Sequence, residues 1–387
     1  MSRLEELIQQ HCPDGVEYMP VGQISEVKRG ERLTKSSLKA DGEYIVVSGG
    51  VSPMGRYTNY NRNENTITIS SYGAAGYVGF QTEKFWANDV CLCVYPKDVI
   101  SNKYLYYALK KEQNYLYSKT TKAIPDHIPT EIILDLNIPL PPLPVQEEIV
   151  RILDSFAELQ AELQAELQKR LQQYNYYRDN LFSFEGRTDV EWKKLGDVAS
   201  IKTGRRFVRT DIRESGVPCF HYGDIYTYYG LTATTTKGYL DAELASKLRF
   251  AQPNDVVVVC AGENDMDIGV GVAWLGNEPA VAHDACCILH HHQNPRYISH
   301  FLRTHNYHLQ IRRYVKNGKI SSLPASGLAE AIIPIPSLEE QERIATILDR
   351  FDALTTDITA GLPAEIEARR KQYEYYRDRL LTFKQKA

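Results

Sequence analysis

The 387-residue sequence lacks the marks of a secreted, membrane-embedded or zinc-binding protein. Its seven cysteines form no C-x-x-C pair, and Cys91, Cys93, Cys286 and Cys287 fall in apolar, strand-like runs. We therefore expect buried thiols in a reducing compartment and neither disulfides nor zinc ligands. No apolar run approaches the length of a membrane span, and no signal peptide is recognisable. These absences predict a soluble protein of the cytoplasm.

Catalytic motifs are missing as well. The sequence contains no phosphate-binding G-x-x-x-x-G-K-[ST] loop and no convincing set of nuclease carboxylates. Asn294–Tyr297 (NPRY) lacks the second proline of the N-P-P-aromatic loop of adenine methyltransferases, so we interpret it as a helix start. His290–His292 has no spaced Cys or carboxylate set around it and is interpreted as a loop. The acidic stretch Gly262–Gly269 is interpreted as a loop tip able to accept a bond from a cytosine amino group. We expect no catalytic residue, metal or cofactor in this chain.

What the sequence does contain is an internal duplication. The string YNYYRDNLF (Tyr174–Phe182) returns as YEYYRDRLL (Tyr373–Leu381). Two further pairs of segments match, Val16–Gly30 with Val190–Gly204 and Ile138–Phe156 with Ile333–Phe351. The segments between these ends are only faintly similar. Self-similarity of this kind indicates one structural unit used twice. We expect the repeated ends to form a shared scaffold and the divergent middles to carry specificity.

The repeated ends read as long helices. Between Val145 and Leu181 apolar residues recur at an average step near 3.6, and the same pattern returns between Glu340 and Phe383, with a kink or brief break expected at Gly361–Pro363. Two such helices are expected to bury their stripes on each other as an antiparallel coiled coil with pseudo-two-fold symmetry. Each middle is expected to be a twisted sheet with a few helices, which gives an α+β fold.

The tyrosines of the doubled motif are divided by this helix pattern. Those on the apolar stripe, Tyr174 and Tyr177 with Tyr373 and Tyr376, are expected to pack in the helix pair. Tyrosine and arginine side chains off the stripe are expected to contact partner proteins, and these are Tyr176, Arg178, Tyr375 and Arg377.

The charge of the chain is unevenly distributed. The net charge is −4, but the middles carry 14 basic against 13 acidic residues and 16 against 14, while the remainder carries 15 against 22. Basic residues cluster among Gly, Ser and Thr at equivalent places in both copies. A solvated surface is the alternative for any single cluster, but the duplication favours DNA phosphate contacts. The expected phosphate-contacting residues are Lys28, Arg29, Arg32, Lys35, Lys119, Lys122, Lys202, Arg205, Arg206, Arg209, Arg312, Arg313, Lys316 and Lys319.

The duplication resembles a known family. Two variable domains, each followed by a helix that opens with P-x-P…QE(E/R)I and closes with Q-Y-x-Y-Y-R-D-x-L, resemble specificity subunits of type I restriction-modification enzymes. The resemblance spans essentially the whole chain. The AELQ repeats at Ala157–Gln168 resemble those of the subgroup with tetrapeptide spacer repeats.

This resemblance implies a non-catalytic subunit that reads double-stranded DNA. It implies two target recognition domains, each reading one half of a split site, docked to two modification subunits and to restriction subunits. S-adenosylmethionine, ATP and magnesium would belong to those partners. The expected domains are an N-terminal segment (1–15) packing with the helices, recognition domains at 16–137 and 188–332, and helical spacers at 138–187 and 333–387.

Base-reading residues are expected in polar and aromatic loops of the middles, although a place in the core is the alternative for each tyrosine. The expected base readers are Arg56, Tyr57, Asn59, Arg62, Ser71, Tyr72, His221, Tyr222, Asp224 and Tyr226. Two other functions remain open: a recognition subunit of a type II system that cuts on both sides of its site, and a catalytic DNA enzyme in its own right.

Overall fold

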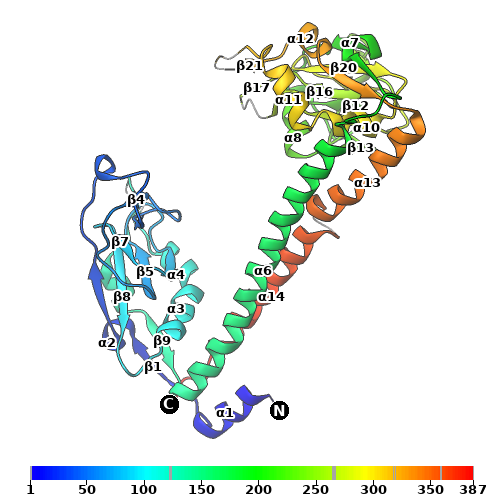
Figure 1. Ribbon diagram of the computed structural model, residues 1–387. Coiled ribbons are helices and arrows are strands. Elements are labelled where there is room, and N and C mark those ends of the chain that lie inside the picture. Colours follow the sequence, from blue (N-terminus) through cyan, green and yellow to red (C-terminus); the bar gives the residue numbers. More distant parts are fainter. Residues whose placement is uncertain are drawn as a thin grey trace. The chain divides into compact units, whose positions relative to one another are not determined.

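The computed structural model describes residues 2–121, 124–263, 267–316, 318, 320–357 and 360–386. The chain divides into two compact units (Figure 1). Unit 1 comprises Met1–Glu162 and Ile366–Ala387, and unit 2 comprises Leu163–Glu365. Both units mix helices and sheets, so the predicted α+β class is confirmed.

Unit 1 is built on two sheets. A four-stranded sheet has the order β2-β8-β5-β6, and a three-stranded sheet has the order β4-β3-β7 with β3 and β7 parallel. The strands are β2 (Ser25–Arg29), β3 (Tyr44–Val47), β4 (Gly55–Tyr57), β5 (Thr66–Ser70), β6 (Val78–Gln81), β7 (Phe85–Ala87) and β8 (Cys91–Pro96). All five side chains of β5 are buried, and its Ile67 and Ile69 share an apolar core with Tyr104 and Leu105.

Short elements close the base of unit 1. Strands β1 (Glu17–Pro20) and β9 (Asn137–Leu140) pair in antiparallel fashion. The helices are α1 (Arg3–His11), α2 (Val21–Ile24), α3 (Asn102–Lys111), α4 (Gln113–Ser118) and α5 (Thr130–Leu134), with the 3-10 turn η1 (Lys35–Ser37). The capping box of Ser2 and Glu5 starts α1, and Leu4 of α1 shares the apolar core with Val145 and Leu381.

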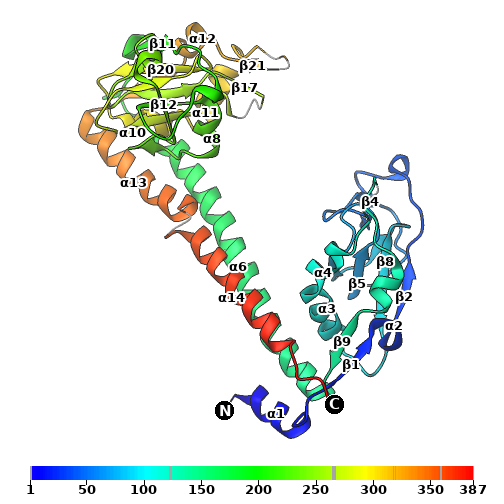
Figure 2. The same ribbon diagram turned by 180° about the vertical axis from the view of Figure 1, so that it is seen from behind.

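Unit 2, which Figure 2 shows from behind, repeats this plan with insertions. Its sheets have the orders β11-β20-β16-β18-β13 and β14-β12-β19-β15, and β12 runs parallel to β19 as β3 does to β7. The strands are β10 (Glu191–Lys194), β11 (Ala199–Thr203), β12 (Val217–Phe220), β13 (Thr232–Ala233), β14 (Gly238–Leu240), β15 (Phe250–Ala251), β16 (Val256–Val259), β17 (Ala261–Gly262), β18 (Gly271–Trp274), β19 (Ala280–Ala282), β20 (Cys286–His291), β21 (Ser321–Ser322) and β22 (Ile332–Ile335).

Most helices of unit 2 also have a counterpart in unit 1. β10 pairs with β22 as β1 does with β9. The short helices are α7 (Leu195–Val198), η2 (Arg209–Asp211), α8 (Tyr222–Thr227), α9 (Ala242–Ala245), α10 (Pro295–Phe301), α11 (His305–Arg312) and α12 (Ala325–Ala329). Elements α8, α9 and β13 have no counterpart among the described elements of unit 1, whereas β15 corresponds to the isolated bridge between Arg62 and Phe85.

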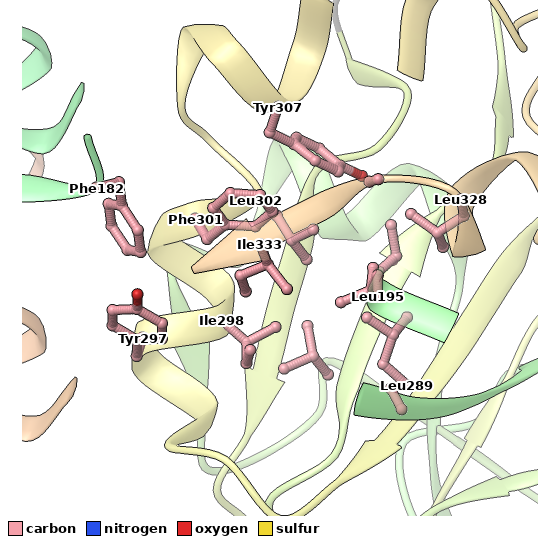
Figure 3. Packing of buried hydrophobic residues seen from close by; sticks show 14 of the residues in the cluster. Phe182, Leu195, Leu289, Tyr297, Ile298, Phe301, Leu302, Tyr307, Leu328 and Ile333 are labelled. Atoms are coloured by element: carbon pink, nitrogen blue, oxygen red, sulfur yellow. The ribbon is translucent and has the colours of Figure 1, made fainter. Parts of the chain in front are cut away.

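The core of unit 2 is apolar and aromatic (Figure 3). Phe182, at the end of a long helix, lies 4.7 Å from Tyr297 of α10, measured between ring centroids. Leu195 of α7, Leu289 of β20 and Ile333 of β22 meet in the same cluster. Burying each such side chain contributes roughly 1.5–3 kcal/mol. This core fastens the helix end to the sheet.

The long helices are α6 (Leu143–Leu181), α13 (Leu338–Thr356) and α14 (Leu362–Leu380). In unit 2, Tyr174 of α6 stacks on Phe351 of α13, while Arg187 beyond α6 pairs with Glu340 near the start of α13. Partner numbers fall as α6 residue numbers rise, so this pair is antiparallel. In unit 1, Phe156 of α6 stacks on Tyr376 of α14 at 5.3 Å.

Other predictions about these elements are confirmed. Helix α6 is one continuous helix, and its counterpart breaks between Thr356 and Leu362, next to the predicted Gly361–Pro363. Asn294 caps α10 with Pro295 in its first turn, as expected for NPRY. All seven cysteines are buried.

One interpretation was wrong. Strand β20 continues through His290 and His291, so these residues do not form a loop. The strand extends because β11 and β16 flank it on both sides and supply its backbone partners.

Burial of His291 predicts acid sensitivity of unit 2. The residue is 7 % exposed, its Nε2 has no partner among the described residues, and burial lowers its pKa to about 4. The unfolded chain binds a proton near pH 6.5 and the folded chain does not, so stability falls as pH drops from 6.5 to 4. We expect this group to remove about 3 kcal/mol over that range.

The measurement is urea unfolding at pH 7 and pH 4 for the wild type and for His291→Asn. The asparagine keeps an acceptor for the Gln293 amide, which donates to His291 Nδ1 at 3.2 Å. The variant should lose about 3 kcal/mol less than the wild type between the two pH values. Equal losses would show that the buried imidazole is not the cause.

Candidate nucleic-acid interface

The repeated glutamines fasten each long helix to its unit. Gln146 and Gln341 are fully buried. Gln146 accepts from Ser101 N and donates to Pro141 O, and Gln341 accepts from Asn294 N and donates to Pro336 O. These four bonds span 2.7–3.0 Å. A buried amide needs all its partners, so the repetition of this residue reflects a structural role.

The repeated aspartates make a second attachment. Asp154 accepts from Lys103 Nζ and Tyr107 OH, both at 2.6 Å. Asp349 accepts from His300 Nε2 at 2.9 Å and from Arg296. Burial alone would raise the pKa of Asp349, but the hydrogen bond from His300 and the charge of Arg296 outweigh burial and lower it. The carboxylate is therefore ionised and holds α10 against α13.

The doubled tyrosine motif divides as its helix pattern predicts, with one exception. Tyr174 is 4 % exposed, and its hydroxyl donates to Asp352, while Tyr176 and Tyr375 are 64 % and 59 % exposed. The exception is Tyr177, which stacks on Phe351 but remains 40 % exposed.

The two arginines of this motif are less open than the tyrosines. Arg377 is only 15 % exposed at its side chain and pairs with Asp378. Arg178 is half-buried and lies over the Tyr174 ring.

In unit 1, the chain passes very close to the sheet at Gly30. A Cβ at Gly30 would lie 2.2 Å from Asn88 O and 2.3 Å from Ala87 O. The next residues are held by the buried Asn88 side chain, which accepts from Leu33 N at 2.9 Å and donates to Leu33 O. Asn88 also donates to Ser48 Oγ after β3. These bonds join the loops that follow β2, β3 and β7 at one edge of unit 1.

Two more loops reach the same edge. Ala74 N donates to Gly49 O at 2.7 Å, and Gly73 N donates to Asp126 O at 3.0 Å. The Tyr72 and His127 rings face each other with centroids 4.4 Å apart. Ser71 is fully buried and its hydroxyl donates to Val90 O, so Ser71 holds the loop while Tyr72 is partly exposed.

The corresponding edge of unit 2 has the same backbone and different side chains. A Cβ at Gly204 would meet His283 O at 2.2 Å and Ala282 O at 2.3 Å. His283 Nε2 bonds to Phe207 O at 3.1 Å and takes the place of Asn88. His221 follows β12 where Ser48 follows β3, and its ring lies 4.9 Å from that of His283.

Burial disfavours the protonated form of these two imidazoles. Burial lowers the pKa of His221, with a smaller contribution from the charge of His283, and burial also lowers the pKa of His283. His221 Nδ1 accepts from Gly223 N at 3.3 Å, so the proton of the neutral ring lies on Nε2. Nε2 therefore presents a hydrogen-bond donor at this edge.

The remaining predicted base readers lie in two places, on α8 and around β4. Tyr222 and Tyr226 stand on α8 beside His221, and Tyr226 is 37 % exposed. Asp224 on the same helix is largely buried and pairs with Lys237 at 3.0 Å.

The other four predicted readers lie on β4 or follow it in the chain. This place is near the start of β3 and away from Tyr72. Arg56 Nε donates to Gly42 O, Arg62 donates to Arg29 O and Asn61 O, Tyr57 packs edge-on against Trp86, and Asn59 is exposed. The two guanidinium groups are therefore tied to backbone carbonyls.

The predicted phosphate-contacting residues are all exposed where the structure describes them. Lys122 and Lys319 lie outside the described residues, as does much of the acidic stretch after Gly262. Some exposed residues are engaged: Lys28 pairs with Glu26 at 2.9 Å, and Arg205 donates to Lys247 O. Arg206 and Arg209 make no ion pair with a described residue.

Sequence reasoning missed Asn88, His127, Phe207 and His283. A signal for two of them was present, because Ala87-Asn88-Asp89 and Ala282-His283-Asp284 follow matching apolar strands. His127 had no such signal, since its role depends on a bridge between Tyr72 and His127 that only the fold creates.

Metal-binding and membrane-spanning features are absent from the part of the chain that the structure describes. No group of three or more His, Cys, Asp or Glu side chains in the described ranges is placed to hold a metal ion. Among the described helices, none combines the length and hydropathy needed to cross a membrane.

Comparison with solved structures shows that the fold is known. A crystal structure of a type I restriction-modification S subunit from M. genitalium superposes with a TM-score of 0.59 at 18% identity, covering 95% of this chain and 96% of that one. A chain solved in work on complex assembly and conformational transition of the type I R-M system gives a TM-score of 0.58 at 16% identity, covering 95% and 98%.

Sequence relatives match this chain over nearly its whole length. The chain is 31% identical to a type I restriction enzyme specificity subunit of Escherichia coli, over 99% of this chain and 97% of the relative. It is also 31% identical to a putative type I restriction enzyme specificity subunit of Haemophilus influenzae, over 95% and 96%.

The family model matches this chain twice, once in each copy of the duplication. The family described as type I restriction modification DNA specificity domain matches residues 13–173 and again residues 188–368. The two matches cover both copies of the repeat that the sequence and the two units display. The chain therefore belongs to the type I restriction-modification DNA specificity family, whose members are specificity subunits and are non-catalytic on their own.

Proposed function

We propose that this chain reads a split DNA target, with the loop edge of unit 1 reading one half and the loop edge of unit 2 reading the other. One observation carries the proposal: equivalent backbone positions hold different side chains. Asn88 corresponds to His283, and the other pairs are Ser48 with His221, Gly49 with Tyr222, Tyr72 with Ala261 and His127 with Ser322. A common frame with divergent polar tips is what two readers of different sequences require.

The polar side chains at these positions can form hydrogen bonds with the edges of DNA bases. The Nε2–H of His221 can donate to a purine N7 or O6, and the Tyr72 and Tyr222 hydroxyls can donate or accept. Arg56, Tyr57, Asn59 and Arg62 remain candidate readers in unit 1, provided that their guanidinium groups exchange carbonyl partners for bases. The exposed basic residues of each unit would hold the phosphates on either side.

Membership of the family supports a proposal for the assembly. We assign recognition domains to 16–137 and 188–332, joined by helical segments 138–187 and 333–387, with 1–15 packing beside them. The chain would bind DNA, two modification subunits and restriction subunits, and the exposed Tyr176 and Tyr375 are candidate contacts. S-adenosylmethionine, ATP and magnesium would be held by those partners. The three AELQ copies support membership of the subgroup with tetrapeptide spacers.

The test is methylome sequencing of a host that expresses this chain with its cognate modification subunit. Replacing residues 31–135 with those of a relative should change one half of the methylated site, and replacing 205–330 should change the other half. A change in both halves from either exchange would contradict the assignment of one reader to each unit.

A separate prediction concerns the phosphate contacts. Arg206→Ala should weaken DNA binding and reduce the slope of log affinity against log salt by about one, with no change in the preferred sequence. The exposed Arg350 on α13 lies in no basic cluster of the described residues, so Arg350→Ala is the matched control. DNA binding of each variant, measured at several salt concentrations, gives the two slopes for comparison. A changed sequence preference for Arg206→Ala would assign that residue to base reading.

No observation favours a type II recognition subunit or a stand-alone DNA enzyme. A methyl-transfer assay on the purified chain discriminates the latter, because turnover without any partner would contradict the assignment of catalysis to other subunits.

A further inference from the structure

The loop after β2 in unit 1 and the loop after β11 in unit 2 differ at one charged position. Both loops pass close over a sheet at a repeated glycine, Gly30 or Gly204, and each forms a 3-10 turn that begins at the fifth residue after it. That residue is Lys35 in unit 1 and Arg209 in unit 2. The second residue after each glycine, in contrast, is arginine in both copies. A shared arginine suits phosphate contacts, which any DNA offers, whereas the difference at Arg209 indicates a role that belongs to unit 2 alone.

The backbone around Arg209 is held by its neighbours. Phe207 is buried, and its ring lies 5.0 Å from that of His283, measured between centroids. Val208 N donates to Asp211 Oδ2 at 2.8 Å and closes the turn. The side chain of Arg209 is exposed, and its guanidinium makes no hydrogen bond or ion pair with a described residue. A well-held backbone therefore presents a free guanidinium at the loop edge of unit 2.

This guanidinium meets two other polar groups beside α8. A Cβ placed on Gly223 would lie 3.6 Å from both Arg209 Nη2 and His221 Nδ1. The same point would lie 3.7 Å from Tyr226 OH. Gly223 and Tyr226 belong to α8, which has no counterpart among the described elements of unit 1. Side chains from the loop after β11, from the end of β12 and from α8 therefore converge here, and Lys35 lacks these neighbours.

The converging groups are hydrogen-bond donors. A guanidinium has no acceptor, and His221 accepts from Gly223 N at its Nδ1, which leaves the ring proton on Nε2. Burial raises the pKa of Tyr226, and neighbouring groups add to the rise, so the phenol keeps its proton and can donate. A set of donors requires a ligand with acceptors. In the major groove guanine presents two acceptors, N7 and O6, and a phosphate group presents acceptors as well.

Two carboxylates favour guanine over phosphate. Beyond burial and the neighbouring Tyr222, the charges of Asp267 and Glu263 are the next causes of the raised pKa of Tyr226, so both carboxylates lie near its hydroxyl. They would repel a phosphate at the converging groups, whereas a guanine base is neutral. Arginine in place of lysine also favours guanine, because a planar guanidinium matches N7 and O6 of one base and an ammonium is a point charge.

We infer that Arg209 reads a guanine in the half-site of unit 2 and donates to O6 and N7 of that base. His221 and Tyr226 flank this contact. The inference rests on the proposed function, because it deepens the assignment of that half-site to the loop edge of unit 2. It assigns Arg209 to base reading in place of the phosphate contact that its basic cluster suggests.

The test measures DNA binding by the chain assembled with its cognate modification subunit. The probes are duplexes that carry the methylated site, with each base pair of the half-site of unit 2 replaced in turn. Arg209→Lys keeps the charge and loses the planar fork. It should therefore keep the wild-type slope of log affinity against log salt, while the preference for one guanine falls about tenfold or more. Arg209→Ala should lose the same preference.

The matched control comes from the equivalent position of unit 1. Lys35→Ala should reduce the slope by about one and leave the preferred sequence unchanged, because Lys35 has no α8 beside it. Both substituted side chains are exposed, and thermal melts check that the variants fold.

The outcomes distinguish failure of this inference from failure of the proposed function. A reduced slope with an unchanged preference in Arg209→Ala would assign the residue to a phosphate and overturn the inference. A half-site of unit 2 that contains no G·C pair would overturn it as well. Either result leaves the proposed function intact. If the wild-type chain directs no methylation at a split site, the proposed function fails together with this inference.

Discussion

Gly204→Ala should destabilise unit 2 and abolish reading by its loop edge. The added methyl group would lie 2.2 Å from His283 O and 2.3 Å from Ala282 O, and both atoms belong to the backbone of a central strand and its turn. Neither can rotate away as a side chain would. Overpacking of this kind costs about 1–3 kcal/mol or more, which corresponds to a drop in melting temperature of about 3–10 °C for a unit of this size.

A matched control is available in the same unit. A Cβ at Gly230 would meet nothing within 4 Å among the described residues, so Gly230→Ala should change stability by less than about 0.5 kcal/mol. Calorimetry of the two variants measures the difference, and methylome sequencing reports whether the half-site read by unit 2 is lost. Equal melting temperatures would show that the loop after β11 is free to move away from His283.

The same glycine shows what could be predicted from sequence. Gly30 and Gly204 were matched as parts of a repeat, and the structure supplies the reason, since each passes over a carbonyl pair at the end of β7 or β19. Gln146 with Gln341 and Asp154 with Asp349 were found in the same way. Repetition identifies such residues because both units need the same internal bonds, whatever their middles do.

The reading edge was less predictable because it is assembled from residues far apart in sequence. Tyr72 meets His127, and Phe207 meets His283, only through sheet order and the parallel pairing of β3 with β7 and of β12 with β19. Periodicity carries no information on which strands become neighbours. Nor does residue type show that the guanidinium of Arg56 is bonded to Gly42 O, since the same group is equally suited to guanine.

The helix α6 carries the second large prediction. Three tandem AELQ copies occupy Ala157–Gln168 within this continuous helix. None of their side chains is fully buried, so the stretch contributes little to either core. It lies between Phe156, which stacks on Tyr376 in unit 1, and Tyr174, which stacks on Phe351 in unit 2. Length is therefore the property that this stretch can vary without loss of packing.

Deleting one AELQ copy should shorten the unread gap of the target by about one or two base pairs. The helix loses about 6 Å at roughly 1.5 Å per residue, and its C-terminal part rotates by only about 40°, so the apolar stripe is kept. DNA advances about 3.4 Å per base pair. Methylome sequencing of the deletion strain should show both half-sites intact, and an unaltered gap in an active enzyme would mean that α6 does not set the spacing.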